Sequence, residues 1–263
     1  MCRILVASGN IDVPKILESI TLMASDNNSF HELNEKNQGR WKHADGWGVA
    51  YPDKKGSFPI KKSPKAIFDD PEVKKLNKIT TNFLIAHVRK KAGSEISINN
   101  THPFKAQHPL LGECIFCHNG VVEDEITFAP HYQTEGKTDS EKIFYSILSD
   151  INSDKPLEAM QNTVRNNLKK YSKTKGTNIV LATKDKTYVA MRKNELPRYY
   201  GMMLGRGKDF VLVSSEKLKM FPDILWTSLL PGDVVTINNG TTQYSINREK
   251  IPLLQKISAL ITR

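Results

Sequence analysis

The chain has 263 residues, of which 39% are hydrophobic and 25% charged, so it can bury a sizeable core as folded soluble proteins do. Its longest apolar runs are strand-sized, and its apolar amino terminus is too short for a signal peptide, which argues against a membrane protein and favours a cytoplasmic one. Three cysteines cannot form a closed set of disulfides, and the formal charge of +10 indicates a lysine-rich solvated surface rather than a nucleic-acid-binding one, since no stacking aromatic residues interleave the lysines.

The first half of the chain opens with a short buried strand, expected over residues 2–8, and a helix over residues 13–24 with apolar residues at helical spacing. Residues 25–44 are polar and irregular. The segment Asp45-Gly46-Trp47-Gly48 then leads into a strand through turns that glycine permits. This alternation already indicates a mixed α+β protein.

The middle and the second half of the chain continue this pattern. Strands are expected over residues 82–88 and 113–118, the second ending at the turn signal Asn119-Gly120. Helices are expected over residues 139–151, where Thr138 or Asp139 can cap the first turn, and 156–171. Only strand signals follow, at residues 178–183, 187–191, 210–214 and 234–238, and the first two pair across residues 184–186.

Cys2 has the most distinctive chemistry in the sequence. Methionine is normally removed when the next side chain is small, so the mature chain would begin with this cysteine. An amino-terminal cysteine carries a nucleophilic sulfur and a free α-amine, whose reference pKa of about 7.7–8.0 allows it to act as a general base. The alternative is that Cys2 is only a small buried residue of the first strand.

Six short motifs resemble, in the same order, those of the class II glutamine amidotransferases, whose glutaminase domain is an N-terminal-nucleophile hydrolase. The motifs are Cys2, Asp45-Gly46-Trp47-Gly48, His87-Val88-Arg89, Asn100-Thr101-His102-Pro103, His118-Asn119-Gly120 and Thr138-Asp139-Ser140-Glu141. The chain is most similar to the small stand-alone members of the family. The resemblance implies one amidotransferase domain over residues 2–263, folded as a four-layer αββα sandwich of two mostly antiparallel sheets, with no cofactor and no metal.

The same resemblance assigns roles to the residues of the motifs. Asn119 and Gly120 would donate hydrogen bonds to the oxyanion of the tetrahedral intermediate, although the pair taken alone is typical of a hairpin turn. Arg89 would bind the α-carboxylate of the donor and Asp139 its α-ammonium group, with His87 beside them; the alternatives are a surface arginine and a helix-capping aspartate.

The walls of the expected site would be formed by Asp45, Gly46, Trp47 and His102. His102 and His118 are interpreted as structural hydrogen bonders, because the mechanism needs no further acid or base. Two lysines follow Arg89 where many family members have an aromatic residue that helps to close a loop over glutamine. The sequence therefore does not decide whether the donor is glutamine or another γ-glutamyl compound.

The predicted activity is hydrolysis of the γ-amide of glutamine, or of a related γ-glutamyl bond, through a thioester on Cys2, releasing glutamate and ammonia or an amine. The small-molecule donor is the expected partner, together with a possible ammonia-accepting protein, and neither nucleic acid nor a membrane is expected. The alternative is a non-catalytic subunit of the same fold that regulates a partner or handles its ammonia.

A competing motif is Cys114-Ile115-Phe116-Cys117-His118, which matches the pattern for covalent c-type haem. Residues three apart in a strand point to opposite faces, so the two cysteines are not expected to act together. A zinc site at this motif is also not expected, because no second pair of ligands lies at metal spacing in the sequence.

Overall fold

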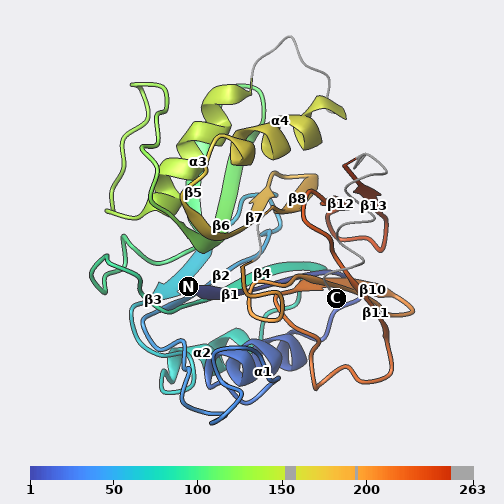
Figure 1. Cartoon of the computed structure of the whole chain (residues 1–263). Coiled ribbons are helices and arrows are strands. Elements are labelled where there is room, and N and C mark those ends of the chain that lie inside the picture. The colour runs from blue at the N-terminus through green and yellow to red at the C-terminus, as the bar shows by residue number, and fades with distance from the viewer. Residues whose placement is uncertain (152–157, 193–194, 250–263) are drawn as a thin grey trace.

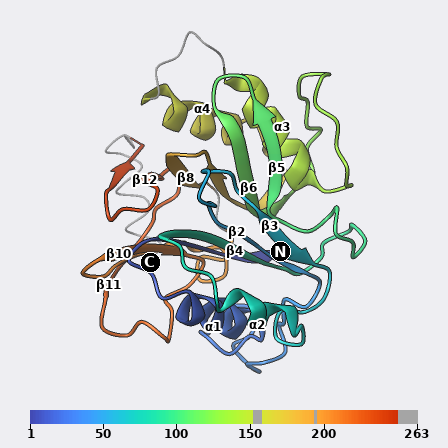
Figure 2. The same cartoon turned by 180° about the vertical axis from the view of Figure 1, so that it is seen from behind.

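The computed structural model describes residues 1–151, 158–192 and 195–249. Two antiparallel sheets lie face to face, and helices cover their outer sides (Figure 1). Helices α1 (Val13–Ala24) and α2 (Glu72–Leu76) cover one sheet, and α3 (Asp139–Asp150) and α4 (Glu158–Lys169) cover the other, as the reverse view in Figure 2 also shows. The predicted four-layer αββα sandwich is therefore confirmed.

The first sheet has seven strands in the order β11-β9-β10-β1-β4-β2-β3, and the second has six in the order β13-β12-β8-β7-β6-β5. The strands of the first sheet are β1 (Cys2–Gly9), β2 (Trp47–Ala50), β3 (Ile60–Ser63), β4 (Phe83–Arg89), β9 (Met203–Arg206), β10 (Phe210–Ser214) and β11 (Leu225–Ser228). Those of the second are β5 (Phe104–His108), β6 (Gly112–Val122), β7 (Thr174–Ala182), β8 (Lys186–Met191), β12 (Val234–Asn238) and β13 (Tyr244–Asn247).

Strand β1 lies in the centre of the first sheet, where it pairs with β4 and β10. Its side chains alternate between two cores, as the two-residue period of a strand requires. Ile4 and Val6 face the second sheet in the core between the sheets, whereas Leu5 and Ala7 pack toward α1. Consequently Cys2 and Arg3, at the start of the same strand, face opposite layers.

Helices α1 and α3 begin where the sequence predicts. Asp12 caps α1 by accepting a hydrogen bond from the backbone N–H of Lys15 at 3.1 Å. Thr138 caps α3 in the same way, accepting from the N–H of Glu141 at 3.2 Å. For the helix predicted over residues 156–171, the structure shows Glu158–Lys169, and Pro156 lies outside the described residues.

The prediction that a strand ends in a turn at Asn119-Gly120 is wrong. Strand β6 continues to Val122, and Asn119 and Gly120 pair with Asn178 and Thr177 of β7, with a register shift after Gly120. The long partner strand supplies the hydrogen bonds that a hairpin would otherwise provide, so pairing within the sheet overrides the local turn preference.

Several short elements were not expected from the sequence. They are α2 and the strands β3, β5, β9, β11 and β13, each of four or five residues. Runs this short carry little periodicity, and most lie at or near a sheet edge, where the pattern of apolar residues is weak. Among the described residues, no helix has the length and apolar character needed to cross a membrane.

Candidate active site

Cys2 lies at the start of β1 and faces the space between the two sheets. Its backbone N–H donates a hydrogen bond to Oδ1 of Asn119 on β6, at 2.7 Å. In the first sheet it stands opposite Arg89 in the ladder between β1 and β4. The fold therefore brings together residues 2, 89 and 119 from three strands and both sheets.

The side chain of Asn119 is completely buried, and only half of its hydrogen-bonding capacity is used. Oδ1 accepts from Cys2, while Nδ2 has no partner in the described part of the chain. A buried amide donor without a partner is costly, so it calls for an explanation. A ligand oxygen beside Cys2 would satisfy it.

Gly120 follows Asn119 at a point where no side chain fits. A Cβ atom there would lie 2.0 Å from the carbonyl oxygen of Gly176 on β7 and 2.7 Å from Nε2 of His118. The close approach of the two strands thus requires glycine, and it keeps the backbone next to Asn119 free of side-chain cover.

Two histidines lie beside Cys2. One ring nitrogen of His87, one of His102 and Sγ of Cys2 all lie within 4.8 Å of one another. The two rings are in contact, with centroids 4.1 Å apart. Burial lowers the pKa of His87 to about 3 and that of His102 well below its usual value, so both imidazoles are neutral at physiological pH.

The glycines of the Asp45-Gly46-Trp47-Gly48 segment let the segment around His102 approach. A Cβ at Gly46 would lie 2.8 Å from Oγ1 of Thr101, and one at Gly48 would lie 2.1 Å from the carbonyl oxygen of His102. Gly48 is also opposite His87 in the ladder between β2 and β4. Because Gly46 and Gly48 carry no side chains, the segment of His102 packs close enough for its ring to contact that of His87.

Arg89 is buried at the end of β4, and a following loop holds its guanidinium group. Nη2 donates to Oγ of Ser94 at 2.7 Å and to the carbonyl oxygens of Ser94 and Glu95 at 3.2 and 3.1 Å, while Nη1 lies 3.4 Å from the carbonyl oxygen of Asp45. Burial lowers the pKa of Arg89, opposed by the nearby Cys2 and Asp45. Arg89 is therefore an oriented cation beside Cys2, not a surface arginine.

Asp139 occupies the first turn of α3, where Thr138 rather than Asp139 is the cap. Its carboxylate accepts from the backbone N–H of Val122 at 2.8 Å and of Ser140 at 2.9 Å, which joins α3 to the end of β6. It is partly exposed, so it keeps a face that a ligand can reach.

The remaining predicted residues have other surroundings. Asp45 accepts a hydrogen bond from the N–H of Lys91, whereas the side chain of Trp47 lies on the opposite face of the sheet, bonded to Asp70 in the core under α1. Trp47 therefore does not line the site with its side chain, because alternation along β2 turns it away. His118 is a hydrogen bonder, to Ser140, but neither ring nitrogen of His102 has a partner in the described part of the chain, which corrects that expectation.

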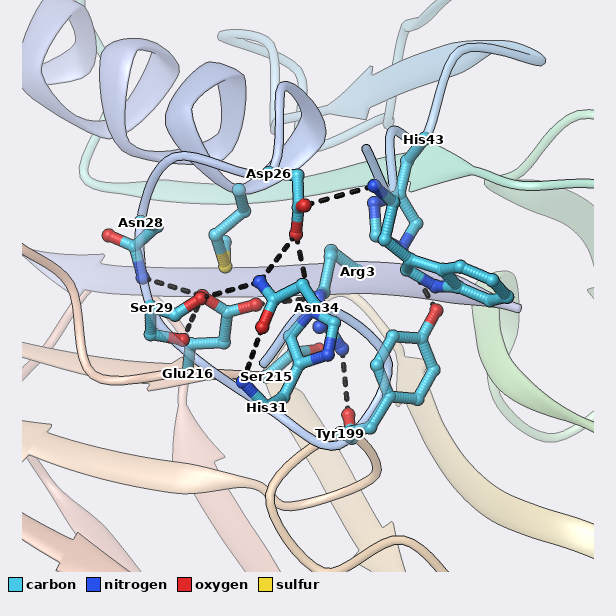
Figure 3. Close-up of polar contacts among 12 residues, drawn as sticks. Arg3, Asp26, Asn28, Ser29, His31, Asn34, His43, Tyr199, Ser215 and Glu216 are labelled. Carbon is cyan, nitrogen blue, oxygen red and sulfur yellow. Dashed lines mark hydrogen bonds and ion pairs between the residues drawn. The ribbon is translucent and has the colours of Figure 1, made fainter. Parts of the chain in front are cut away.

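A polar cluster behind Cys2 was missed by the sequence reasoning. On the helix-facing side of β1, Arg3 is fully buried and its Nε lies 2.7 Å from Oε1 of Glu216 (Figure 3). Arg3 also donates to the carbonyl oxygen of Tyr199 at 2.7 Å, and its guanidinium carbon is 4.0 Å from the centre of that ring. We call these three residues and the polar residues of the 26–43 loop around them the Arg3 cluster.

The Arg3 cluster attaches the irregular 26–43 loop to the central strand. Glu216 accepts from Asn28 at 2.7 Å and from Ser29 at 2.6 Å, and the hydroxyl of Tyr199 lies 3.0 Å from Nε2 of His43 (Figure 3). The available sequence signal was the density of Asn, Asp and His in a segment without periodicity. These residues lie too far apart in the sequence for their pairing to be inferred from spacing.

The Cys114-x-x-Cys117 motif is divided between two cores, as predicted. Cys114 packs with the residues under α3 and α4, and Cys117 lies in the core between the sheets. All three cysteines are buried and free. Burial raises the pKa of the Cys114 thiol to about 12, as expected of an unreactive structural cysteine.

The two facing sheets with helices outside define the fold class of this protein, which has the N-terminal-nucleophile hydrolase architecture. The chain belongs to the class II glutamine amidotransferases: the model of that family matches residues 19–202. An Escherichia coli relative named "Putative glutamine amidotransferase YafJ" is 32% identical over 124 residues, which are 46% of this chain and 48% of the relative. An uncharacterized protein of Methanocaldococcus jannaschii is 35% identical over 129 residues, which are 47% of this chain and 34% of that relative. These matches thus span half or less of the curated relatives' lengths.

Solved structures agree in fold. The glutamine phosphoribosylpyrophosphate amidotransferase of B. subtilis superposes with a TM-score of 0.64 at 17% identity, covering 94% of this chain and 49% of that chain. A class-II domain protein from Silicibacter pomeroyi superposes with a TM-score of 0.60 at 19% identity, covering 95% of this chain and all of that one. The shared architecture includes both sheets.

Proposed function

We propose that this protein hydrolyses the γ-amide of glutamine, or a related γ-glutamyl bond, with Cys2 as the amino-terminal nucleophile. The observation that carries the proposal is the geometry of Asn119, which binds the backbone nitrogen of Cys2 through Oδ1 and leaves a buried, unpartnered Nδ2 donor beside it among the described residues. Such a preorganised donor is what a tetrahedral oxyanion requires. Family membership supports the same reaction.

The proposed reaction has two steps. After removal of Met1, the α-amine of Cys2 takes the thiol proton, the sulfur attacks the γ-carbonyl carbon, and the oxyanion accepts hydrogen bonds from Nδ2 of Asn119 and the N–H of Gly120. Collapse of this intermediate breaks the C–N bond, and the amine returns the proton to the departing ammonia or amine. Water then attacks the thioester, which releases glutamate and restores the thiol.

The donor has two charged ends, which call for one cation and one anion in the site. Arg89 would bind the α-carboxylate with its planar guanidinium group, and Asp139 would bind the α-ammonium group. The loop contacts of Arg89 at Ser94 and Glu95 use neutral oxygens, so a carboxylate is the stronger acceptor and can replace some of them. The neutral histidines 87 and 102 would form an uncharged side of the site rather than a second acid and base.

The released ammonia would pass to water or to an acceptor protein. The B. subtilis enzyme is named as a glutamine phosphoribosylpyrophosphate amidotransferase, and this chain covers 49% of it. We propose that any ammonia produced is used outside the described residues, by an acceptor such as a partner protein.

The test compares Cys2→Ala with Cys117→Ala, a second buried thiol of the core between the sheets. Glutamate release is measured on glutamine, glutathione and other γ-glutamyl compounds, and intact mass spectrometry establishes whether Met1 is absent. We expect Cys2→Ala to abolish turnover without unfolding the protein, and Cys117→Ala to retain it. A Cys2→Ala protein with a tenth of the wild-type rate, or an active wild-type protein that keeps Met1, would refute the mechanism.

A further inference from the structure

The Cys2–His87–His102 cluster consists of three groups that each can ligate a metal ion. Its three candidate ligand atoms lie within 4.8 Å of one another, and all three residues are buried. They come from β1, β4 and the segment before β5, so they converge only in the folded chain. This set is distinct from the Cys114-x-x-Cys117 motif, whose cysteines point to opposite faces.

Three of the four ring nitrogens of the two histidines have no hydrogen-bond partner among the described residues. Nε2 of His87 lies 3.3 Å from the carbonyl oxygen of His118, and Nδ1 has no partner among the described residues. Metal-bound histidines characteristically use one nitrogen for the metal and donate the other N–H to such a carbonyl. His102, only 2% exposed, has no described partner at either nitrogen, which is unusual for a buried imidazole.

The ligand types select the class of ion. One thiolate with two neutral imidazoles suits borderline ions such as Zn²⁺ rather than Mg²⁺ or Ca²⁺, which prefer oxygen. Tetrahedral zinc bonds of about 2.3 Å to sulfur and about 2.0–2.1 Å to nitrogen place ligands roughly 3.3–3.6 Å apart. Small rotations of the three side chains bring a cluster that is already within 4.8 Å to these separations.

We propose that Cys2, His87 and His102 form a zinc-binding site that competes with the donor substrate. The ion replaces the thiol proton of Cys2 and is coordinated by its sulfur and by one nitrogen of each histidine. A fourth position remains for water or, after removal of Met1, for the α-amine of Cys2. Zinc is here an inhibitor that occupies the nucleophile, not a cofactor; this inhibitory consequence rests on the proposed function, whereas binding itself does not.

Cobalt(II) tests binding without any reference to activity, because a thiolate ligand gives a sulfur-to-cobalt charge-transfer band and tetrahedral cobalt gives intense visible bands. Metal-free full-length protein is titrated with Co²⁺ and then with Zn²⁺, which should displace it. We expect one tightly bound ion per chain in the wild type, loss of the charge-transfer band in Cys2→Ala, and affinity at least about tenfold lower in His102→Gln. Circular dichroism establishes that each variant is folded, and His87→Gln replaces His102→Gln if the latter is not.

Two matched controls locate the ion. Cys117→Ala removes a neighbouring buried thiol, and His108→Gln removes a buried histidine of β5 outside the cluster; both should bind cobalt as the wild type does. The inference is overturned if the wild type gives no charge-transfer band, or if that band survives Cys2→Ala and disappears in Cys117→Ala. Should Cys2→Ala abolish turnover while the wild type fails to bind cobalt, the metal site alone is refuted and the proposed reaction stands.

Discussion

Cys2 and Arg3, the first two residues of β1, face opposite sides of the sheet, and the two sides differ in their polar contacts. The face of Cys2 looks into the space between the sheets and contains polar atoms without partners among the described residues, on Asn119, His87 and His102. The face of Arg3 looks toward α1 and is cross-linked by an ion pair and by hydrogen bonds to Tyr199 and through Glu216 to the 26–43 loop. Two neighbouring residues of β1 thus face different surroundings: Cys2 faces the candidate site, and Arg3 faces the polar contacts that attach the 26–43 loop.

This difference shows how the proposed nucleophile Cys2 can be held in place. After the proposed removal of Met1, Cys2 would have no preceding residue to restrain it, so its position would depend on its neighbours. Arg3 provides restraint by burying its charge against Glu216, and Asn119 adds a hydrogen bond to Cys2 itself. Buried polar atoms without partners cost stability on both faces, since Nη2 of Arg3 and Nδ1 of His43 also lack partners among the described residues, but only the Arg3 face has an ion pair. By contrast, the open surface pocket of about 890 Å³ beside Gly9, Asn82 and Gly240, at the other end of β1, is lined by none of these site residues.

Removing Glu216 should produce the largest effect, because it takes away the ion-pair partner of the buried Arg3. Glu216→Ala leaves Arg3 buried without its ion-pair partner, and such a loss costs about 3–5 kcal/mol. We expect this decrease in the free energy of unfolding by urea. Lys75→Ala, which removes the exposed pair with Glu72, is the control and should change stability little. Equal stabilities for the two variants would show that the Arg3 cluster does not support the strand.

Asn119→Ala alters the front face and should act on catalysis. Loss of one oxyanion donor lowers kcat by about 10²-fold or more, with a smaller change in KM. Steady-state glutamate release measures both parameters. Asn178→Ala removes the neighbouring amide, whose Nδ2 is already bound to the carbonyl oxygen of Tyr200, so it should affect mainly stability. A greater kcat loss in Asn178→Ala would transfer the oxyanion role to that residue.

Arg89→Lys should weaken donor binding rather than the chemical step. A charge-assisted contact is worth roughly 1.5–3 kcal/mol, so kcat/KM should fall at least about tenfold, mainly through KM. A donor analogue without the α-carboxylate should be a poor substrate of the wild type and lose little more in the variant. If the wild type hydrolyses the analogue as fast as its parent, Arg89 is not the carboxylate anchor.

The buried neutral histidines 87 and 118 predict the smallest effect, a loss of stability in mild acid. The pKa of His87 is lowered to about 3 and that of His118 to about 4, both by burial, so the unfolded chain binds protons that the folded one does not. Stability is therefore fully present above the unfolded value of about 6.5 and decreases as the pH falls below it. Between pH 7.5 and 6 each histidine should cost about 0.8 kcal/mol.

Urea unfolding at the two pH values measures this decrease. The exposed His131 provides the control, since His131→Gln should leave the pH dependence unchanged. A constant free energy of unfolding over this interval would mean that His87 and His118 titrate equally in the folded and unfolded chains.

Local pattern was sufficient for much of this molecule. The apolar spacing of residues 13–24 predicted α1 at the observed bounds, and the order of six motifs indicated the family and hence the sandwich. Helix and strand periods are properties of short segments, so the sequence shows them directly. The residues that meet at Cys2 were also indicated by these motifs, through the resemblance.

Tertiary structure decided what depends on strands far apart in the chain. Pairing with β7 drew Asn119 and Gly120 into the ladder instead of a turn, and alternation along β2 turned Trp47 away from the site. Sequence spacing likewise does not predict the ion pair between Arg3 and Glu216, which lie 213 positions apart. Nor does it predict that Cys2 lies beside two histidines. The pairing of the strands decides which side chains are buried and which hydrogen-bond partners they have. The energetic and chemical role of a buried charge or lone pair therefore depends on the tertiary structure.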